Sequence, residues 1–394
     1  MFRARPSRAV VAVMLFAIVT LGSTAVQAAE WYVESQVQTQ TSYDTNVRLS
    51  PTDKIDTAAG MVSPEVRIGR RTEALDLSLL GRADLNGYLD PSSLSSVDGK
   101  LRFTGNYTTP RDKLGLETGV NHDTTLTTEV TDTGDLTEAA RVTTVDVVPS
   151  WSHALSEIDT IDVAAGYVNT SYDTDSLTDY VFYSGQVGWS RRVTEIDTLQ
   201  TVAYTGRFEA EDSGDTTADI VGLLFGWSRQ FSEQVSARLA VGPEYVISRF
   251  DEAGGRETDR QLGYRIDGVL AYQMDELTRL DLSGSRKTEP SGSGETVTRN
   301  QLQVALIHRV DPLFTVRLDA TVLQNRDTGS NSGNSDRFYY AIQPRAIWRL
   351  DQDTDLAASY RFRSQDFSDN RDTASSHAVF LTLTHRLPRW SWTD

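Results

Sequence analysis

Arginine and aspartate recur two positions apart along this chain, in stretches where apolar and polar residues alternate. Arg265 and Asp267 form one such pair, and Arg317 and Asp319 form another. Side chains two residues apart lie on the same face of a β-strand, and a guanidinium can hold a carboxylate through two parallel N–H···O contacts. The pairs predict one of two roles: an ionic lattice that braces a polar wall, or a row of arginines that orients an anionic polymer or a sugar.

Long strands must position these side chains. Val221, Leu223, Phe225 and Trp227 occupy alternate positions of one run, and the run that begins at Phe314 repeats the pattern. Strict alternation indicates a strand with one dry and one wet face. Strands of soluble proteins usually have about five or six residues, whereas a tilted strand that crosses a bilayer needs about 9–11. Several runs reach that length, which predicts membrane-spanning strands.

A short polar turn recurs between pairs of strands, at 156–161, at 194–199 and in looser copies about 36–46 residues apart. Long loops alternate with these turns, which is typical of outer-membrane barrels. We therefore predict an all-β, transmembrane, antiparallel up-and-down β-barrel of about 18 strands, within a range of 16–20. The first strand is expected near Trp31 and the last near Leu387, with both termini periplasmic. A propeller, a solenoid or a β-sandwich is the alternative.

The first residues predict export. Arg3, Arg5 and Arg8 precede an apolar run at 9–19 and small residues before Ala29, which is the pattern of a signal peptide over 1–28. Residues 29–394 are then expected to form a single outer-membrane barrel domain. The chain has no cysteine, and its formal net charge of −17 argues against nucleic acid as a partner.

Tryptophans at strand ends predict an aromatic girdle at each membrane interface. Trp151, Trp189, Trp227 and Trp348 lie next to short turns. A second girdle near the long loops is expected from Tyr88, Tyr107, Tyr172, Phe208 and Phe250.

If the apolar residues face lipid, the opposite parity faces the lumen. This assigns the following residues to the lumen: Arg67, Arg82, Arg102, Arg207, Arg238, Arg265, Asp267, Arg279, Arg317, Asp319, Arg345 and Arg361. An 18-stranded barrel is wide enough to enclose an aqueous channel unless loops fill it.

Signals for catalysis or for a cofactor are weak. The five histidines show no ligand spacing on one strand face, so we expect no catalytic residues, no metal site and no cofactor. A catalytic dyad at the loop rim, as in outer-membrane proteases, stays open. Acidic loop clusters such as 173–175 and 211–215 lack the regular ligand array of an EF-hand, and we interpret them as solvated charge.

The segment Tyr43-Asp44-Thr45-Asn46-Val47 resembles the end of the first strand in a family of outer-membrane β-barrel porins associated with exopolysaccharide biosynthesis and export loci. The polar turns followed by Thr-Asp and Leu are similar too. The resemblance implies a porin-like barrel that takes part in exopolysaccharide export. One departure is the C-terminus, where Pro388–Asp394 follows the last expected strand instead of a terminal aromatic residue.

The leading hypothesis is therefore a barrel that passes a secreted polysaccharide, and a general diffusion porin or a structural, adhesive barrel is the alternative. General porins usually fold one long loop inward, and the loop lengths here weakly disfavour this. Expected partners are outer-membrane lipid, the barrel assembly machinery, and an anionic polysaccharide or polysaccharide-export machinery.

Overall fold

A computed structural model describes residues 29–134, 136, 139–210, 216–252, 255–327, 336–367 and 373–393, without the side chains of 250–252, 255–256 and 327. The signal peptide expected over 1–28 lies outside the described residues. The elements in chain order are β1 (Glu30–Asp44), β2 (Thr57–Arg71), β3 (Leu75–Tyr88), η1 (Ser92–Leu94), β4 (Ser96–Thr108), β5 (Asp112–Thr124), α2 (Thr125–Thr128), β6 (Arg141–Ala154), β7 (Asp159–Tyr172), β8 (Tyr180–Arg192), β9 (Asp197–Ala210), β10 (Thr217–Gln230), β11 (Val235–Glu252), β12 (Gly255–Gln273), β13 (Thr278–Pro290), β14 (Thr296–Arg309), β15 (Phe314–Asp327), β16 (Arg337–Arg349), β17 (Thr354–Phe367), β18 (Ala374–Arg386) and β19 (Trp390–Thr393).

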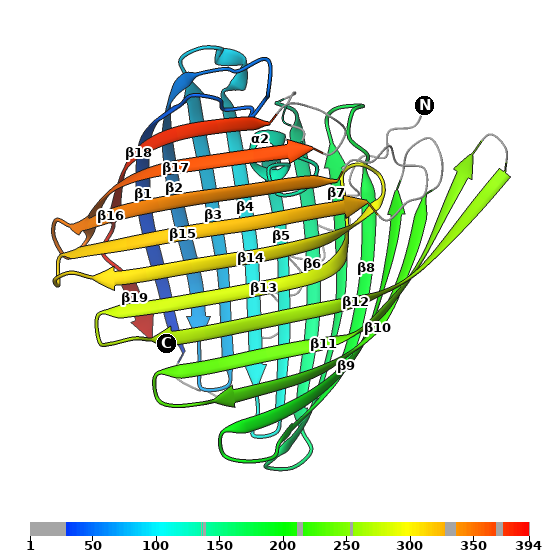
Figure 1. Ribbon diagram of the computed structural model, residues 1–394. Helices are drawn as coiled ribbons and strands as arrows, with labels where there is room; N and C mark the ends of the chain where they lie inside the picture. Colours follow the sequence, from blue (N-terminus) through cyan, green and yellow to red (C-terminus); the bar gives the residue numbers. More distant parts are fainter. Residues whose placement is uncertain are drawn as a thin grey trace.

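The strands form one closed antiparallel barrel of 18 strands, as the sequence predicts. Each strand from β1 to β17 pairs with the next along the chain, and β1 closes the barrel by pairing with β18 from Gln36–Arg386 to Asp44–Ala378. Short turns gather at one end of the barrel, and the longer loops and the protruding β11–β12 hairpin lie at the other (Figure 1). Among the described residues, none of the helices is long and apolar enough to cross a membrane.

The repeated turn has a local chemical cause. A Ser, Thr or Asp stands near the start of the turn, and its side chain accepts the backbone N–H groups two and three residues further on. The Ser156 hydroxyl accepts from Ile158 and Asp159 at 3.2 and 3.0 Å, and the Asp311 carboxylate accepts from Leu313 and Phe314 at 2.7 and 2.9 Å. Such side-chain caps stabilise tight turns without contacts from distant residues. The position of each turn can therefore be predicted from the sequence.

The outer face carries the apolar residues. Val221, Phe225 and Trp227 are exposed on it, and the strand register extends this face around the barrel. A closed barrel leaves no unpaired strand edge and is one of the two structures that span a membrane. Together with the apolar outer face, this places the protein in the bacterial outer membrane.

The first aromatic girdle lies where the sequence places it, but the second differs. Trp151, Trp189, Trp227 and Trp348 are exposed on the outer face near short turns. Tyr107 also lies at the short-turn end, and the register puts Tyr88, Tyr172 and Phe208 on the inner face. The outward aromatic residues nearest the long loops include Tyr43, Tyr183 and Phe338. The side chain of Phe250 lies outside the described residues.

The C-terminal tail lengthens the closing seam. β19 pairs with the first residues of β1, from Glu30–Thr393 to Val33–Trp390, below the β1–β18 pairing. The rings of Trp31 and Trp392 stack with centroids 6.3 Å apart, and Arg389 pairs with Glu30 at 2.9 Å. The residues after Pro388 therefore continue the wall of the barrel.

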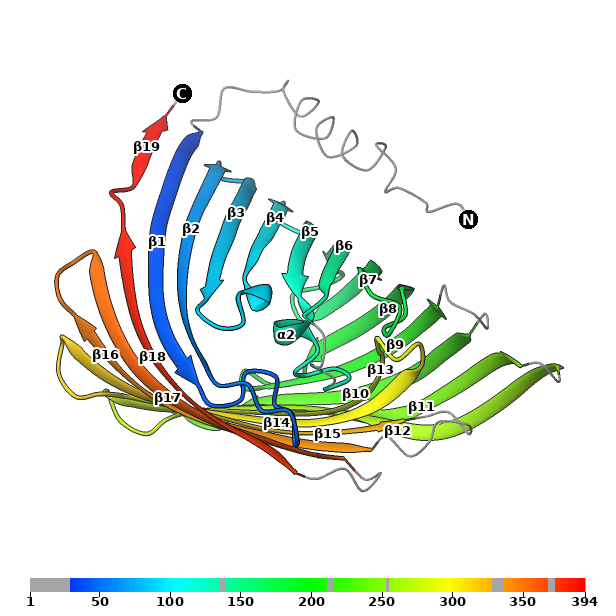
Figure 2. The same ribbon diagram turned by 90° about the horizontal axis from the view of Figure 1, so that it is seen from above.

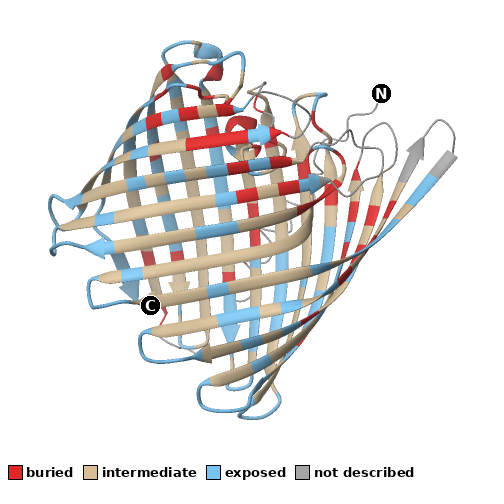
Figure 3. Ribbon diagram, viewed as in Figure 1, coloured by how far each residue is buried: buried red, intermediate tan, exposed pale blue. Residues whose placement is uncertain are grey.

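One loop folds into the lumen. Residues 125–134, which include α2 and which we call the inward segment, lie inside the curve of the strands (Figure 2). Leu126 packs there with Leu49 of the β1–β2 loop and with Leu323 and Tyr339 of the wall. The buried residues concentrate at this end of the barrel (Figure 3). Loop length made an inward loop look less favourable, and this expectation is wrong, because even a loop of modest length can cross part of the lumen from the rim.

Candidate functional site

The inward segment is held by polar side chains on the inner face of β15–β17. Arg337, only 1% exposed, donates to the carbonyl oxygens of Val130 at 2.6 Å and Asp132 at 3.4 Å. Gln365 donates to the carbonyl oxygen of Gly134 at 3.2 Å, and Asn325 donates to that of Asp132 at 2.5 Å. Buried backbone carbonyls need such partners, so the wall fixes the position of the segment.

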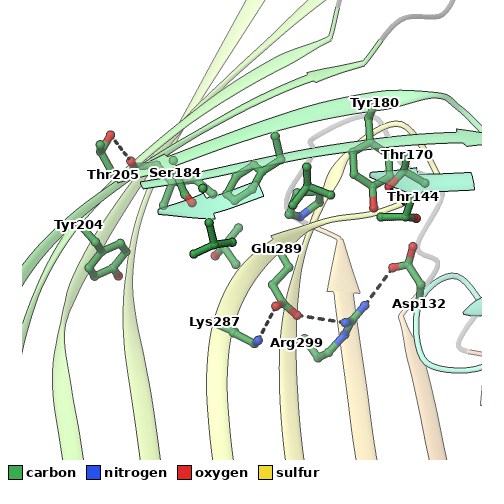
Figure 4. Close-up of a pocket in the computed structure, with 18 of the residues that line it drawn as sticks. Asp132, Thr144, Thr170, Tyr180, Ser184, Tyr204, Thr205, Lys287, Glu289 and Arg299 are labelled. Carbon is green, nitrogen blue, oxygen red and sulfur yellow. Dashed lines mark hydrogen bonds and ion pairs between the residues drawn. The ribbon is translucent and has the colours of Figure 1, made fainter. Parts of the chain in front are cut away.

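An ionic chain links the inward segment to the wall. Asp132 accepts from Arg299 at 2.9 Å, Arg299 pairs with Glu289 at 3.0 Å, and Glu289 pairs with Lys287. Figure 4 shows these four side chains in a row along one edge of a cavity. The backbone N–H of Gly292 also donates to Asp132, at 2.8 Å. The carboxylate of Asp132 is thus balanced by contacts from two parts of the β13–β14 hairpin.

A second carboxyl group of the inward segment is buried, and none of the described cations forms an ion pair with it. Glu129 is 1% exposed, and it accepts from the hydroxyls of Thr133 at 2.8 Å and Tyr172 at 3.1 Å. Burial, reinforced by the negative charge of Asp132, raises the pKa of Glu129 to about 7. This group therefore changes charge near neutral pH.

Two cavities flank the inward segment. One of about 600 Å³ lies toward β6–β14 and includes Tyr180, Tyr204 and the ionic chain at its border (Figure 4). The other, of about 650 Å³, lies toward β2–β6. Both are lined by Thr128, Val142 and Thr144. Each volume falls within the range of about 300–1,000 Å³ that small-molecule sites occupy, so the lumen has room for solutes on either side of the segment.

The wall of the first cavity combines aromatic rings with fixed charges. Tyr204 donates to Glu244 at 2.8 Å, and Thr288 donates to the other oxygen of the same carboxylate at 2.6 Å. The guanidinium of Arg265 lies over the Tyr204 ring, 4.9 Å from its centroid. These contacts lock the polar groups of the wall, while Tyr172 and Tyr180 add further rings to the lining.

The strand register places most of the lumenal residues expected from sequence on the same face as the cavity lining. This group consists of Arg67, Arg82, Arg102, Arg238, Arg265, Asp267, Arg279, Arg317, Asp319, Arg345 and Arg361. Many are paired along one strand: Arg265 with Asp267 at 2.8 Å and Arg317 with Asp319 at 2.7 Å. Arg82 and Arg279 pair in the same way with Asp84 and Asp281, each at 2.8 Å. These pairs fit the bracing lattice.

Arg207 is the exception and lies on the outer face. Its neighbours in β9, Gly206 and Phe208, face inward, and Arg207 pairs outside with Glu209 at 2.6 Å. Arg207 is opposite the outward-facing Tyr183, near the long loops. A charged residue is tolerated at this level because the outer face meets the polar headgroup region, while Phe208 packs in an inner cluster with Ala218. A parity rule carried over from the membrane zone therefore misplaces this residue.

A few lumenal cations have no acidic partner. Within the described part of the chain, no carboxylate lies within 4.0 Å of the charged atoms of Arg67, Lys100, Arg238 or Arg345. Lys100 was not among the residues expected from sequence. Its inner position follows from its register opposite Arg82.

The residues that hold the inward segment were also missed. Arg299 and Arg337 lie on the same inner face as Arg317 and Arg345, so the alternation of residues along the strands was enough to predict that they point into the lumen. Their role was not, because it depends on Asp132, Val130 and other loop residues that are distant in sequence. The one local signal was the high polarity of these strands near their loop ends.

The segment that carries the family resemblance closes the seam. Asp44 is 6% exposed and contacts Arg361 at 3.1 Å and Arg363 at 3.2 Å, two strands away. The Asn46 amide donates to the carbonyl oxygens of Ser50 at 2.7 Å and Ser375 at 3.0 Å. These contacts join β1, its following loop, β17 and β18.

No protein-family model matches the sequence, and no curated protein matches it. Among solved structures, the chain is similar to the unliganded ferric citrate transporter FecA, with 10% identity, a TM-score of 0.49 and coverage of 86% of this chain and 60% of FecA. It thus spans less than two thirds of the length of that transporter. It is also similar to Pseudomonas aeruginosa OpdQ, with 10% identity, a TM-score of 0.48 and coverage of 91% and 98%. For P. aeruginosa OpdK with vanillate the identity is 10% and the TM-score 0.47, with coverage of 91% of this chain and 99% of OpdK. At such identities the similarity is one of overall barrel shape.

Proposed function

We propose that this protein is a porin-like channel that lets polar solutes cross the outer membrane and that it performs no catalysis. The observation that carries the proposal is the pair of cavities beside the inward segment, each bordered by charged and hydroxyl side chains. A polar, incompletely filled lumen inside an apolar barrel is the arrangement that water and hydrophilic solutes need. The inward segment would set the width of the path and favour small solutes.

Reconstitution of the mature barrel tests this proposal. In planar bilayers we expect discrete, stable conductance steps, and in liposomes we expect swelling with small sugars. A properly folded barrel, recognised by its heat-modifiable mobility in gels, that gives neither conductance nor swelling would refute the channel and favour a structural or adhesive barrel.

A second candidate is the export of a secreted polysaccharide, with polysaccharide-export machinery as its partner. Two observations favour it. The segment Tyr43–Val47 resembles that of export-associated porins. The first cavity is lined by the rings of Tyr172, Tyr180 and Tyr204, whose faces lie beside charged groups and can stack against sugar rings. Deletion of the gene should then lower the secreted polymer while leaving small-sugar uptake nearly unchanged. The reverse result would leave only the diffusion channel.

A further inference from the structure

The cavity on the β2–β6 side has an unusual charge arrangement. Arg82 and Lys100 are directly opposite each other in the β3–β4 register, and Arg102 is opposite Leu80, which is itself opposite Arg67. Four cations and one carboxylate, that of Glu65 opposite Arg82, thus occupy two adjacent rows on three neighbouring strands. Like charges placed opposite each other destabilise a sheet, so this arrangement calls for negative charge nearby.

The protein supplies that charge to only part of the group. Arg82 pairs with Asp84 at 2.8 Å and with Glu65 at 3.9 Å. Arg102 reaches Asp146 at 3.3 Å, two strands away, and it passes over Gly119, where a Cβ atom would lie 2.7 Å from the Asp146 carboxylate. The buried Asp98 is already paired with Arg141 at 2.6 Å. Its charge is therefore not available to its neighbours in the cavity.

Arg67 and Lys100 remain exposed to the lumen, with no described carboxylate within 4.0 Å of either charged group. Both line the same cavity of about 650 Å³, together with the neutral polar groups of Asn121, Thr128 and Thr144. The other charged groups of the lining are Arg82, Arg102 and the carboxylates of Glu65, Asp84, Asp98 and Asp123, and none of these carboxylates lies within 4.0 Å of the charged groups of Arg67 or Lys100. A hollow with low-dielectric walls concentrates the field of such charges. The free guanidinium can hold a carboxylate through two contacts, and the ammonium adds a point charge.

We propose that Arg67 and Lys100 form a subsite for a carboxylate-bearing, hydroxyl-rich solute, that is, a sugar acid. The carboxylate would sit between the two cations, and the hydroxyl groups would contact the amide and hydroxyl side chains of the cavity. This inference deepens the proposed channel function and rests on it for the solute's route. On this account Arg265 and Arg317 do not determine anion selectivity, because each is already paired with a carboxylate, Asp267 and Asp319 respectively.

The test combines binding and conduction, with glucuronate as the probe and glucose as its neutral counterpart. Binding is measured by calorimetry on the detergent-solubilised barrel, and current block is measured in planar bilayers. We expect glucuronate to bind and to block the current, and glucose to do neither at the same concentration. Arg67→Gln and Lys100→Gln should each weaken both effects about tenfold or more, since each removes a charge-assisted contact.

Arg345→Gln is the matched control. Arg345 is also a lumenal cation without an acidic partner among the described residues, but it does not line this cavity, so its loss changes the net charge equally. Equal weakening by Arg345→Gln would overturn the subsite in favour of a diffuse charge effect. A conducting barrel that does not bind glucuronate would also overturn it, whereas binding without conduction would refute the channel and leave the subsite standing. Heat-modifiable mobility verifies that each variant is folded.

Discussion

Arg337 is a fully buried attachment of the inward segment, and replacing it should release the segment from the wall. Its guanidinium donates two hydrogen bonds to the segment, to the carbonyl oxygens of Val130 at 2.6 Å and Asp132 at 3.4 Å, and a third to Gln365 of the wall at 3.0 Å. Hydrogen bonds to charged groups contribute about 1.5–3 kcal/mol each, so the gross loss in Arg337→Met is about 3–6 kcal/mol. The substitution also removes a buried cation that has no described carboxylate within ion-pair distance, which offsets part of the loss.

A net weakening of about 2 kcal/mol raises the population of the detached segment roughly 30-fold. In single-channel recordings we expect Arg337→Met to show frequent transitions to a larger conductance, because the detached segment no longer narrows the lumen. A glutamate-specific protease should also cleave after Glu129 faster than in the native barrel. Arg345→Met serves as the control, since no hydrogen bond or ion pair is found for Arg345 among the described residues. Native conductance and native protease resistance in folded Arg337→Met would refute this account of the segment.

Three further predictions follow from the same geometry. Leu223→Arg should impair assembly, because an arginine that faces lipid near the midplane costs about 2–4 kcal/mol, whereas Ser228→Arg, on the inner face, should assemble well in the same outer-membrane fractionation. Glu129 has a pKa raised to about 7, so the folded protein binds more protons than the unfolded chain between about pH 4.5 and 7. Attachment of the inward segment should therefore weaken as pH rises through this window, by about 3 kcal/mol in all, and Glu129→Gln should remove the pH dependence of conductance. Gly134 has a φ of +73° and a Cβ there would lie 2.2 Å from Arg337, so Gly134→Ala should increase protease cleavage of the segment, and unchanged cleavage would contradict that contact.

The lumenal arginines show which ion pairs can be predicted from local sequence spacing and which cannot. Arg317 and Asp319 are two residues apart on one strand, so their contact was predictable from sequence spacing and is present at 2.7 Å. Arg345 has the same parity but no acidic neighbour at that spacing, and no described carboxylate pairs with it. Pairing along a strand is a short-range property. A variant at a lumenal arginine should therefore be interpreted only after its partner is known.

Sequence alone determined the barrel, its strand count, its repeated turns and the face on which most lumenal charges lie. These features depend on period-two alternation and on side-chain caps within a few residues, as at Ser156 and Asp311, and such interactions need no knowledge of distant parts of the chain.

Tertiary structure alone decided how the lumen is filled. The inward segment is fixed by Arg299 and Arg337, which lie more than 160 residues from Asp132 in the chain. It likewise decided that Arg207 lies outside, because Phe208 turns inward to pack in a buried cluster and its neighbour on the strand must then face outward. Which cations stay free depends on which carboxylates the closed wall brings within reach, and only the closed barrel defines that.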